Sequence, residues 1–150
     1  DMNFFEGAEK LLELWFTKTD GRITSNNDLR RIPEWAISML LSDIGCKIVS
    51  FERGPYLDAY VLSESSLFIG QKHFILKTCG SIAQLRCIPA VLNLAETYAG
   101  FDEIEDVFYS RKNFMRPELQ LVPHRKFDEE VRYLEKYFKD ELVYKFGRYK

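Results

Sequence analysis

The stretch YVLSESSLFIGQKHFILKTC, residues 60–79, carries the pattern that decides the fold. It begins and continues after its centre with β-branched and aromatic residues, which are typical of strands. A polar cluster, Ser63, Glu64, Ser65 and Ser66, interrupts this pattern. Serine hydroxyls often bond nearby backbone groups and so favour turns. The stretch therefore predicts strands joined by a turn, and the pattern alone leaves any further role of the serines open.

Hydrophobic periodicity predicts the elements on either side of this stretch. Within it, SLFIG and HFILKTC are expected as strand segments around Gly70. Other strands are expected at 46–52, 56–62 and 104–110, a further strand could start at 141–147, a loop is expected at 20–28, and helices are expected at 32–45, 82–100 and 126–140. Pro33 suits a first helical turn, and Pro89 suits a kinked or late-starting helix. The order β-α-β-β-β-α-β-α predicts an α+β domain, in which an antiparallel sheet is covered by helices on one face.

The segment FFEGAEKLLELWF, residues 4–16, fits two periods. A helical period places Glu6, Glu9 and Glu13 on one face, and a strand period places Glu9 and Glu13 on one face. Either period brings Glu9 and Glu13 together, and exposed like charges at such spacing repel by about 0.2–0.5 kcal/mol. The pair is therefore either a solvated acidic edge or a site for a cation.

Composition and charge bound the class of protein. The 150 residues are 46% hydrophobic and 15% aromatic, which suits one packed domain or part of one. The net charge of -2 indicates neither nucleic acid nor an anionic membrane as a partner. No run has membrane-spanning length and the N-terminus lacks signal-peptide features, so a cytoplasmic protein is expected. Cys46, Cys79 and Cys87 lack the spacing of a zinc site, so free thiols and no metal are expected.

Five motifs, FFEGAEKLLELWF, AYVLSESSLFI, FILKTCG, FYSRKNFMRPELQ and PHRKFDEE, occur in this order. Together they resemble the eukaryotic S-adenosylmethionine decarboxylases, the pyruvoyl enzymes of polyamine synthesis. The resemblance runs through nearly all 150 residues but covers roughly the first half of that family's chain. It implies that residues 1–150 are the N-terminal part of a single domain and form half of a four-layer αββα sandwich. It also implies a strand for residues 4–16, with a bulge at Gly7 that re-aims Glu6.

The resemblance implies that LSESS is a self-cleavage site. The proenzyme of this family cuts itself there, so the scissile bond would join Glu64 to Ser65, and Ser65 would become the pyruvoyl group. The pyruvoyl ketone would form a Schiff base with the amino group of S-adenosylmethionine, and the conjugated amide carbonyl would accept the electrons released with carbon dioxide. The cysteine of the TCG motif, Cys79, would then donate a proton, which suits a thiol with an ordinary pKa of about 8.5. Cys46 and Cys87 are expected to be small buried residues.

The substrate and activator sites are also implied by the resemblance. Phe5 would stack on the adenine, Glu6 and Glu9 would lie in the active site, and the backbone of Leu62 and Glu64 would contact the base.

Glu13 resembles the glutamate of a putrescine site in animal members, with Lys10 and Lys77 as neighbouring relays. A diamine dication there would relieve the repulsion between Glu9 and Glu13. No role is assigned to His73, and His124 is expected to order a loop.

Two functions remain open from the sequence. The chain is either the N-terminal part of an active decarboxylase, expected to be a homodimer as in the family, or an inactive or truncated paralogue that regulates an active partner. The intact LSESS, TCG and FEGAEK motifs favour the enzyme. The isolated 150-residue chain is expected to be inactive, because one face of its sheet would lack its partner layer.

Overall fold

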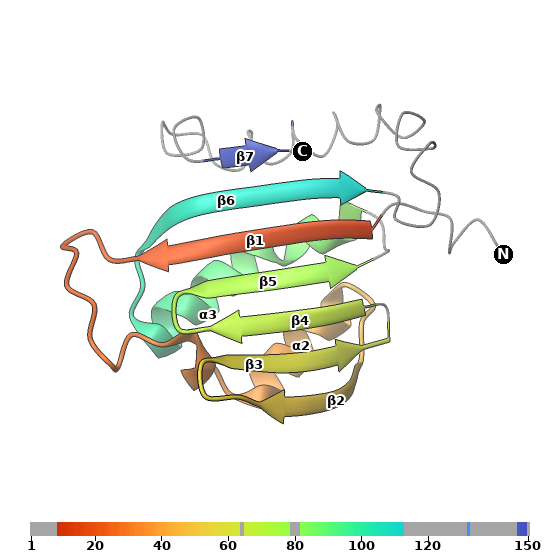
Figure 1. The fold of residues 1–150 in the computed structure, drawn as a ribbon, viewed down its shortest axis with the longest axis horizontal. Coiled ribbons are helices and arrows are strands. Elements are labelled where there is room, and N and C mark those ends of the chain that lie inside the picture. Colours follow the sequence, from red (N-terminus) through yellow and green to blue (C-terminus); the bar gives the residue numbers. More distant parts are fainter. Residues whose placement is uncertain (1–8, 64, 79–81, 113–131, 133–146, 150) are drawn as a thin grey trace, which may run out of the picture.

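In the part of the chain that the structure describes, one sheet carries α2 and α3 on the same face (Figure 1). The computed structural model describes residues 9–63, 65–78, 82–112, 132 and 147–149. The strands are β1 (Glu9–Thr17), β2 (Ile48–Arg53), β3 (Leu57–Leu62), β4 (Ser65–Gly70), β5 (His73–Thr78), β6 (Glu103–Lys112) and β7 (Gly147–Tyr149). The helices are η1 (Leu29–Arg31), α2 (Glu34–Asp43), η2 (Ile82–Cys87) and α3 (Ile88–Ala99). The strand order is β2-β3-β4-β5-β1-β6-β7, with antiparallel neighbours from β2 to β6 and β7 parallel to β6. The α+β prediction is confirmed.

β1 lies between β5 and β6, and this position settles the ambiguity of the N-terminal segment. Leu12, Leu14 and Phe16 are buried, whereas Leu11, Glu13 and Trp15 are half-buried on the opposite face. This alternation is the period of a strand, so the strand prediction is confirmed from Glu9 onward. Each fully buried leucine contributes about 1.5–3 kcal/mol by removing apolar surface from water. Gly7 and its predicted bulge lie outside the described residues.

The two helices predicted at 32–45 and 82–100 are present with shorter α-helical bounds. Pro33 is the N-cap of α2, immediately before the first helical turn. Residues 82–87 form the 3₁₀ helix η2, and α3 then starts at Ile88 with Pro89 in its first turn, so the late-starting helix is confirmed. Gly100 ends α3 with a φ of 69°, a left-handed conformation that favours glycine. Neither α2 nor α3 is long and apolar enough to cross a membrane in this described part of the chain.

Residues 65–78 contain the two strand segments expected around Gly70, although the predicted element order counts them as one strand. They form two full strands, β4 and β5, with only Gln71 and Lys72 between them, so four strands separate the helices instead of three. The predicted helix at 126–140 lies outside the described residues except for Arg132, which is helical. The possible strand at 141–147 also lies outside them except for Gly147, which begins β7.

A buried acid fixes the turn between β2 and β3. Asp58 is 2% exposed and forms ion pairs with Arg53 at 3.4 Å and with Arg30 at 4.0 Å. Burial raises the pKa of Asp58, and the two guanidinium groups oppose that shift. Arg30 also donates hydrogen bonds to the carbonyl oxygens of Gly54 and Pro55, so it anchors η1 to this turn.

Candidate functional site

The serine cluster lies at the turn between β3 and β4. Ser63 and Glu64 connect the last residue of β3 to the first residue of β4, Ser65. The Ser63 amide donates to the Lys47 carbonyl oxygen at 2.9 Å, and the Ser63 hydroxyl accepts from the Lys47 amide at 3.0 Å. These bonds tie the turn to the segment that leads into β2, so Ser63 has the structural role that is usual for serine in turns. Glu64 lies outside the described residues.

Ser65 lies at one end of a row of residues that spans three strands. Ser65 on β4 pairs with Thr78 on β5, and Thr78 pairs with Lys10 on β1. Neighbouring strands lie about 4.8 Å apart, so the backbones of these three residues fall within about 10 Å. Cys79 follows Thr78 in the sequence and lies outside the described residues. Glu9 begins β1 beside Lys10, so the predicted site residues on β1, β4 and β5 come to one end of the sheet, at the right of Figure 1.

Leu62 ends β3 at the same end of the sheet (Figure 1). Its side chain is 5% exposed and belongs to the core, which leaves only its backbone for a ligand. Phe5 and Glu6 lie outside the described residues, and the side chains of Glu9 and Lys10 are not among those described.

Glu13 occupies the face of the sheet opposite the buried core residues of β1, here called the open face. The Trp15 indole Nε1 donates a hydrogen bond to Glu13 Oε1 at 2.5 Å. On the adjacent strands, Glu13 pairs with Ile75 on β5 and with Phe108 on β6. The side chains of these three residues and of Trp15 are half-buried. The Glu13 carboxylate is therefore held between apolar neighbours.

Lys77 lies on the open face diagonally across from Glu13. Its cross-strand partner is Leu11, two residues before Glu13, and such diagonal positions are about 7–8 Å apart. The ammonium group lies 5.8 Å from the centre of the Phe68 ring, a cation–π distance. Among the described side chains, no ion pair joins Lys77 to Glu13.

A model of the adenosylmethionine decarboxylase family matches residues 2–150. The chain belongs to the adenosylmethionine decarboxylase family. Three relatives are named S-adenosylmethionine decarboxylase proenzyme. The protein from Xenopus laevis is 48% identical, and the match covers 97% of this chain and 43% of the relative. The protein from Caenorhabditis elegans is 48% identical, over 98% of this chain and 39% of the relative. The protein from Drosophila melanogaster is 45% identical, over 97% of this chain and 41% of the relative. The chain therefore spans about two fifths of the length of these relatives.

Within this member of the decarboxylase family, sequence reasoning missed a contact made by His73. The His73 imidazole stacks on the Trp15 indole, with ring centres 4.4 Å apart and planes inclined by 22°. Burial lowers the pKa of His73, and the Glu13 carboxylate opposes that shift. The sequence could indicate only part of this contact, because the strand period places Glu13 and Trp15 on one face. Their closeness to His73 depends on the pairing of β1 with β5.

The two described cysteines of this family member are core residues. Cys46 and Cys87 are each 3% exposed, and both are thiols, as expected. Burial raises the pKa of Cys87 to about 12, so this thiol stays protonated and unreactive near neutral pH.

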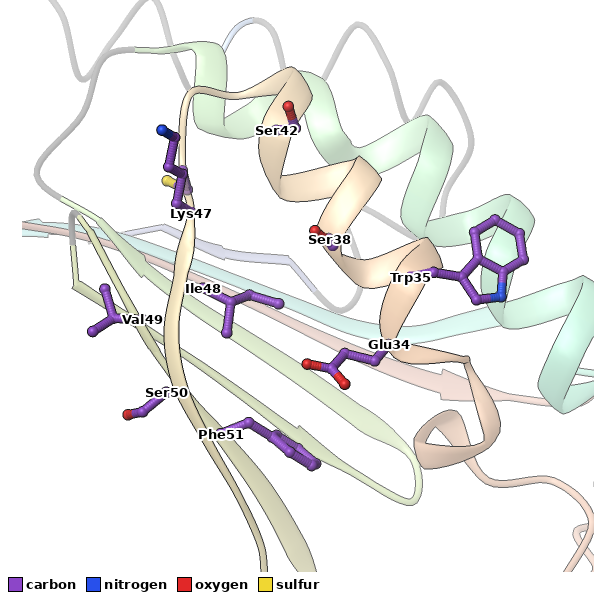
Figure 2. Close-up of a pocket in the computed structure, with 10 residues that line it drawn as sticks. Glu34, Trp35, Ser38, Ser42, Lys47, Ile48, Val49, Ser50 and Phe51 are labelled. Carbon is purple, nitrogen blue, oxygen red and sulfur yellow. The ribbon is translucent and has the colours of Figure 1, made fainter.

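A groove of about 650 Å³ lies away from the predicted residues, between α2 and the edge strand β2 (Figure 2). Residues of α2, namely Glu34, Trp35, Ser38 and Ser42, line it on one side, and Phe51 of β2 lines it on the other. It contains none of the residues that the sequence assigns to catalysis. We therefore place the candidate active site of this decarboxylase relative at the strand ends near Ser65.

Proposed function

We propose that this chain supplies the self-processing and substrate-binding part of a pyruvoyl-dependent S-adenosylmethionine decarboxylase, which makes the aminopropyl donor for spermidine and spermine. Family membership supports this proposal, and the observation that carries it is the pairing of Ser65 with Thr78. This pairing brings the precursor of the pyruvoyl group beside the residue that precedes Cys79. The protein is expected to act in the cytoplasm as a homodimer.

Self-cleavage begins with the hydroxyl of Ser65. Its Oγ attacks the carbonyl carbon of Glu64, so that the peptide C–N bond breaks, an ester forms and the amino group of Ser65 becomes free. Elimination then removes the α-proton of Ser65 and breaks its Cβ–Oγ bond, and Glu64 leaves as a carboxylate. The remaining dehydroalanine tautomerises to an imine, which water hydrolyses to a pyruvoyl group and ammonia.

The position of Ser65 fits this chemistry. Ser65 is the first residue of β4, directly after the turn, so the bond before it lies outside the β4 strand. Cleavage there would cut the covalent connection between β3 and β4 and leave the pairing of β4 with both β3 and β5 intact. The new terminus would stay fixed opposite Thr78.

Once formed, the pyruvoyl group would supply an electron sink for decarboxylation through its conjugated amide carbonyl. The residues of this chain bind the substrate and move its proton. Phe5 stacks on the adenine, Glu6 and Glu9 face the sulfonium cation, and the backbone of Leu62 and Glu64 contacts the base. Cys79 donates a proton to the former α-carbon of the substrate.

Glu13 binds the activator putrescine, with Lys10 and Lys77 as neighbours. The support for this role is the place of Glu13 on the open face, where a half-buried carboxylate gains from a cationic ligand.

The test is an activity assay on the complete gene product. Carbon dioxide release from carboxyl-labelled S-adenosylmethionine is expected for the wild type and should be lost in Ser65→Ala. Cys79→Ala is expected to cleave itself but to turn over slowly or to protonate the wrong atom. Ser63→Ala is the matched control, because its hydroxyl already serves the turn. An uncleaved, inactive wild type that raises the activity of a partner would support the regulatory paralogue instead.

A further inference from the structure

Glu13 and Trp15 act as a unit on the open face. They are two residues apart on β1, and the indole N–H of Trp15 donates to one carboxylate oxygen of Glu13. This bond uses one acceptor position of the carboxylate, and it leaves the second oxygen for another donor. It also restricts the rotation of a glutamate side chain, which would otherwise lose conformational freedom on binding a ligand.

The Trp15 indole is itself held by His73. The imidazole stacks on the indole with ring centres 4.4 Å apart, directly across the β1–β5 ladder. Gly70 makes room for this ring, because a Cβ atom at Gly70 would collide with the His73 imidazole. Burial favours the neutral imidazole, so the ring adds no positive charge that would compete for the Glu13 carboxylate.

We propose that Trp15 is a positioning residue, whose indole N–H orients the Glu13 carboxylate toward a diammonium ligand, and that His73 fixes the plane of the indole. The inference rests on the proposed role of Glu13 in binding putrescine. In the bound state the ammonium group of the ligand contacts the free carboxylate oxygen, and Trp15 bonds to Glu13 and stacks on His73 without contacting the ligand. Loss of the indole N–H should therefore weaken binding through Glu13 alone.

The experiment measures putrescine binding to the complete gene product by calorimetry. Trp15→Phe keeps an aromatic ring for His73 but removes the N–H donor. We expect the Kd for putrescine to rise about three- to tenfold, the range of one ordinary hydrogen bond. The melting temperature without putrescine should change by less than about 3 °C. Trp35→Phe is the control, because Trp35 is 61% exposed on α2 and should leave the Kd unchanged.

A double-mutant cycle separates this inference from the proposed function. Glu13→Gln should weaken putrescine binding strongly, and Trp15→Phe in that background should cause no further loss. Equal Kd values for the wild type and Glu13→Gln would overturn the putrescine role of Glu13 and, with it, the inference. Two results would overturn the positioning role alone. In the first, Glu13→Gln raises the Kd for putrescine but Trp15→Phe leaves it unchanged. In the second, Trp15→Phe raises the Kd by the same factor in the wild-type and Glu13→Gln backgrounds.

A second variant covers the case in which Trp15→Phe does not fold. His73→Ala removes the stacking partner and leaves both Glu13 and Trp15 in place. It should raise the Kd in the wild-type background and leave it unchanged in the Glu13→Gln background. An equal increase in both backgrounds would contradict the proposal.

Discussion

Ser65 lies directly opposite Thr78 in the β4–β5 ladder. Backbone hydrogen bonds between the two strands hold such a cross-strand pair at a fixed separation. The short connection through Gln71 and Lys72 sets this register. The sheet therefore determines how far the predicted pyruvoyl precursor lies from the residue that precedes Cys79.

Ser63→Ala tests the structural role of the first serine in the cluster. We expect the variant to lose about 0.5–1.5 kcal/mol of unfolding free energy, because the Lys47 amide loses its hydroxyl acceptor. Urea denaturation gives this value, and gel electrophoresis should show normal self-cleavage. Loss of cleavage in Ser63→Ala at unchanged stability would contradict the assignment of chemistry to Ser65. Ser66→Ala is a second control, since Ser66 pairs with Lys77 and Val61 and has no predicted part in cleavage.

Gly70→Ala tests the space beneath the His73 ring. The added methyl group would overlap the imidazole, so we expect a loss of about 1–3 kcal/mol of unfolding free energy. The double variant Gly70→Ala with His73→Ala should lose less than the sum of the single variants, because the collision is gone. If the losses of unfolding free energy measured by urea denaturation were additive, a contact other than His73 would exclude a side chain at Gly70.

The pH dependence of stability tests the environment of His73. Burial lowers its pKa below the ordinary value of 6.5, so between the folded pKa and 6.5 the unfolded chain binds more protons than the folded chain. Stability therefore falls as the pH drops below about 6.5 and is fully regained above it. His73→Phe keeps a stacked ring without a titrating group, so the stability difference between wild type and variant should narrow or change sign toward acidic pH. A difference that stays constant from about pH 7.5 to about pH 5 would refute a buried, titrating His73.

Thiol alkylation tests the division of roles among the cysteines. In the native protein, iodoacetamide should spare Cys46 and Cys87, because both are buried and burial raises the pKa of Cys87 to about 12. Cys79 should be modified in the native protein if it faces the substrate. Peptide mass spectrometry before and after unfolding in urea measures each site. Native labelling of Cys87 as fast as that of Cys79 would contradict this assignment.

The sequence predicted most of the described fold, because its elements carry strong local patterns. The alternation at 56–62 and the helix signals at 32–45 act within a few residues, and the structure contains both elements. The segment around Glu13 could not be decided in this way, because its residues fit a strand and a helix alike. Pairing with β5 and β6, a nonlocal interaction, selects the strand there.

The candidate site was predicted less completely than the fold. Motifs pointed to Ser65, but they gave no sign that Thr78 and Lys10 lie beside it in consecutive strands. The contact of Trp15 with His73 was missed for the same reason, since strand order is not written in local periodicity. The motifs therefore predicted which residues carry the chemistry, whereas the sheet register determines which residues lie next to them.

Denaturing mass spectrometry of the complete gene product tests the central claim most directly. The account predicts two chains, the larger beginning at position 65 with a pyruvoyl group that lacks the amino nitrogen of serine, and one uncut chain for Ser65→Ala. A single wild-type chain with an ordinary serine at position 65, from a protein that still decarboxylates S-adenosylmethionine, would contradict it.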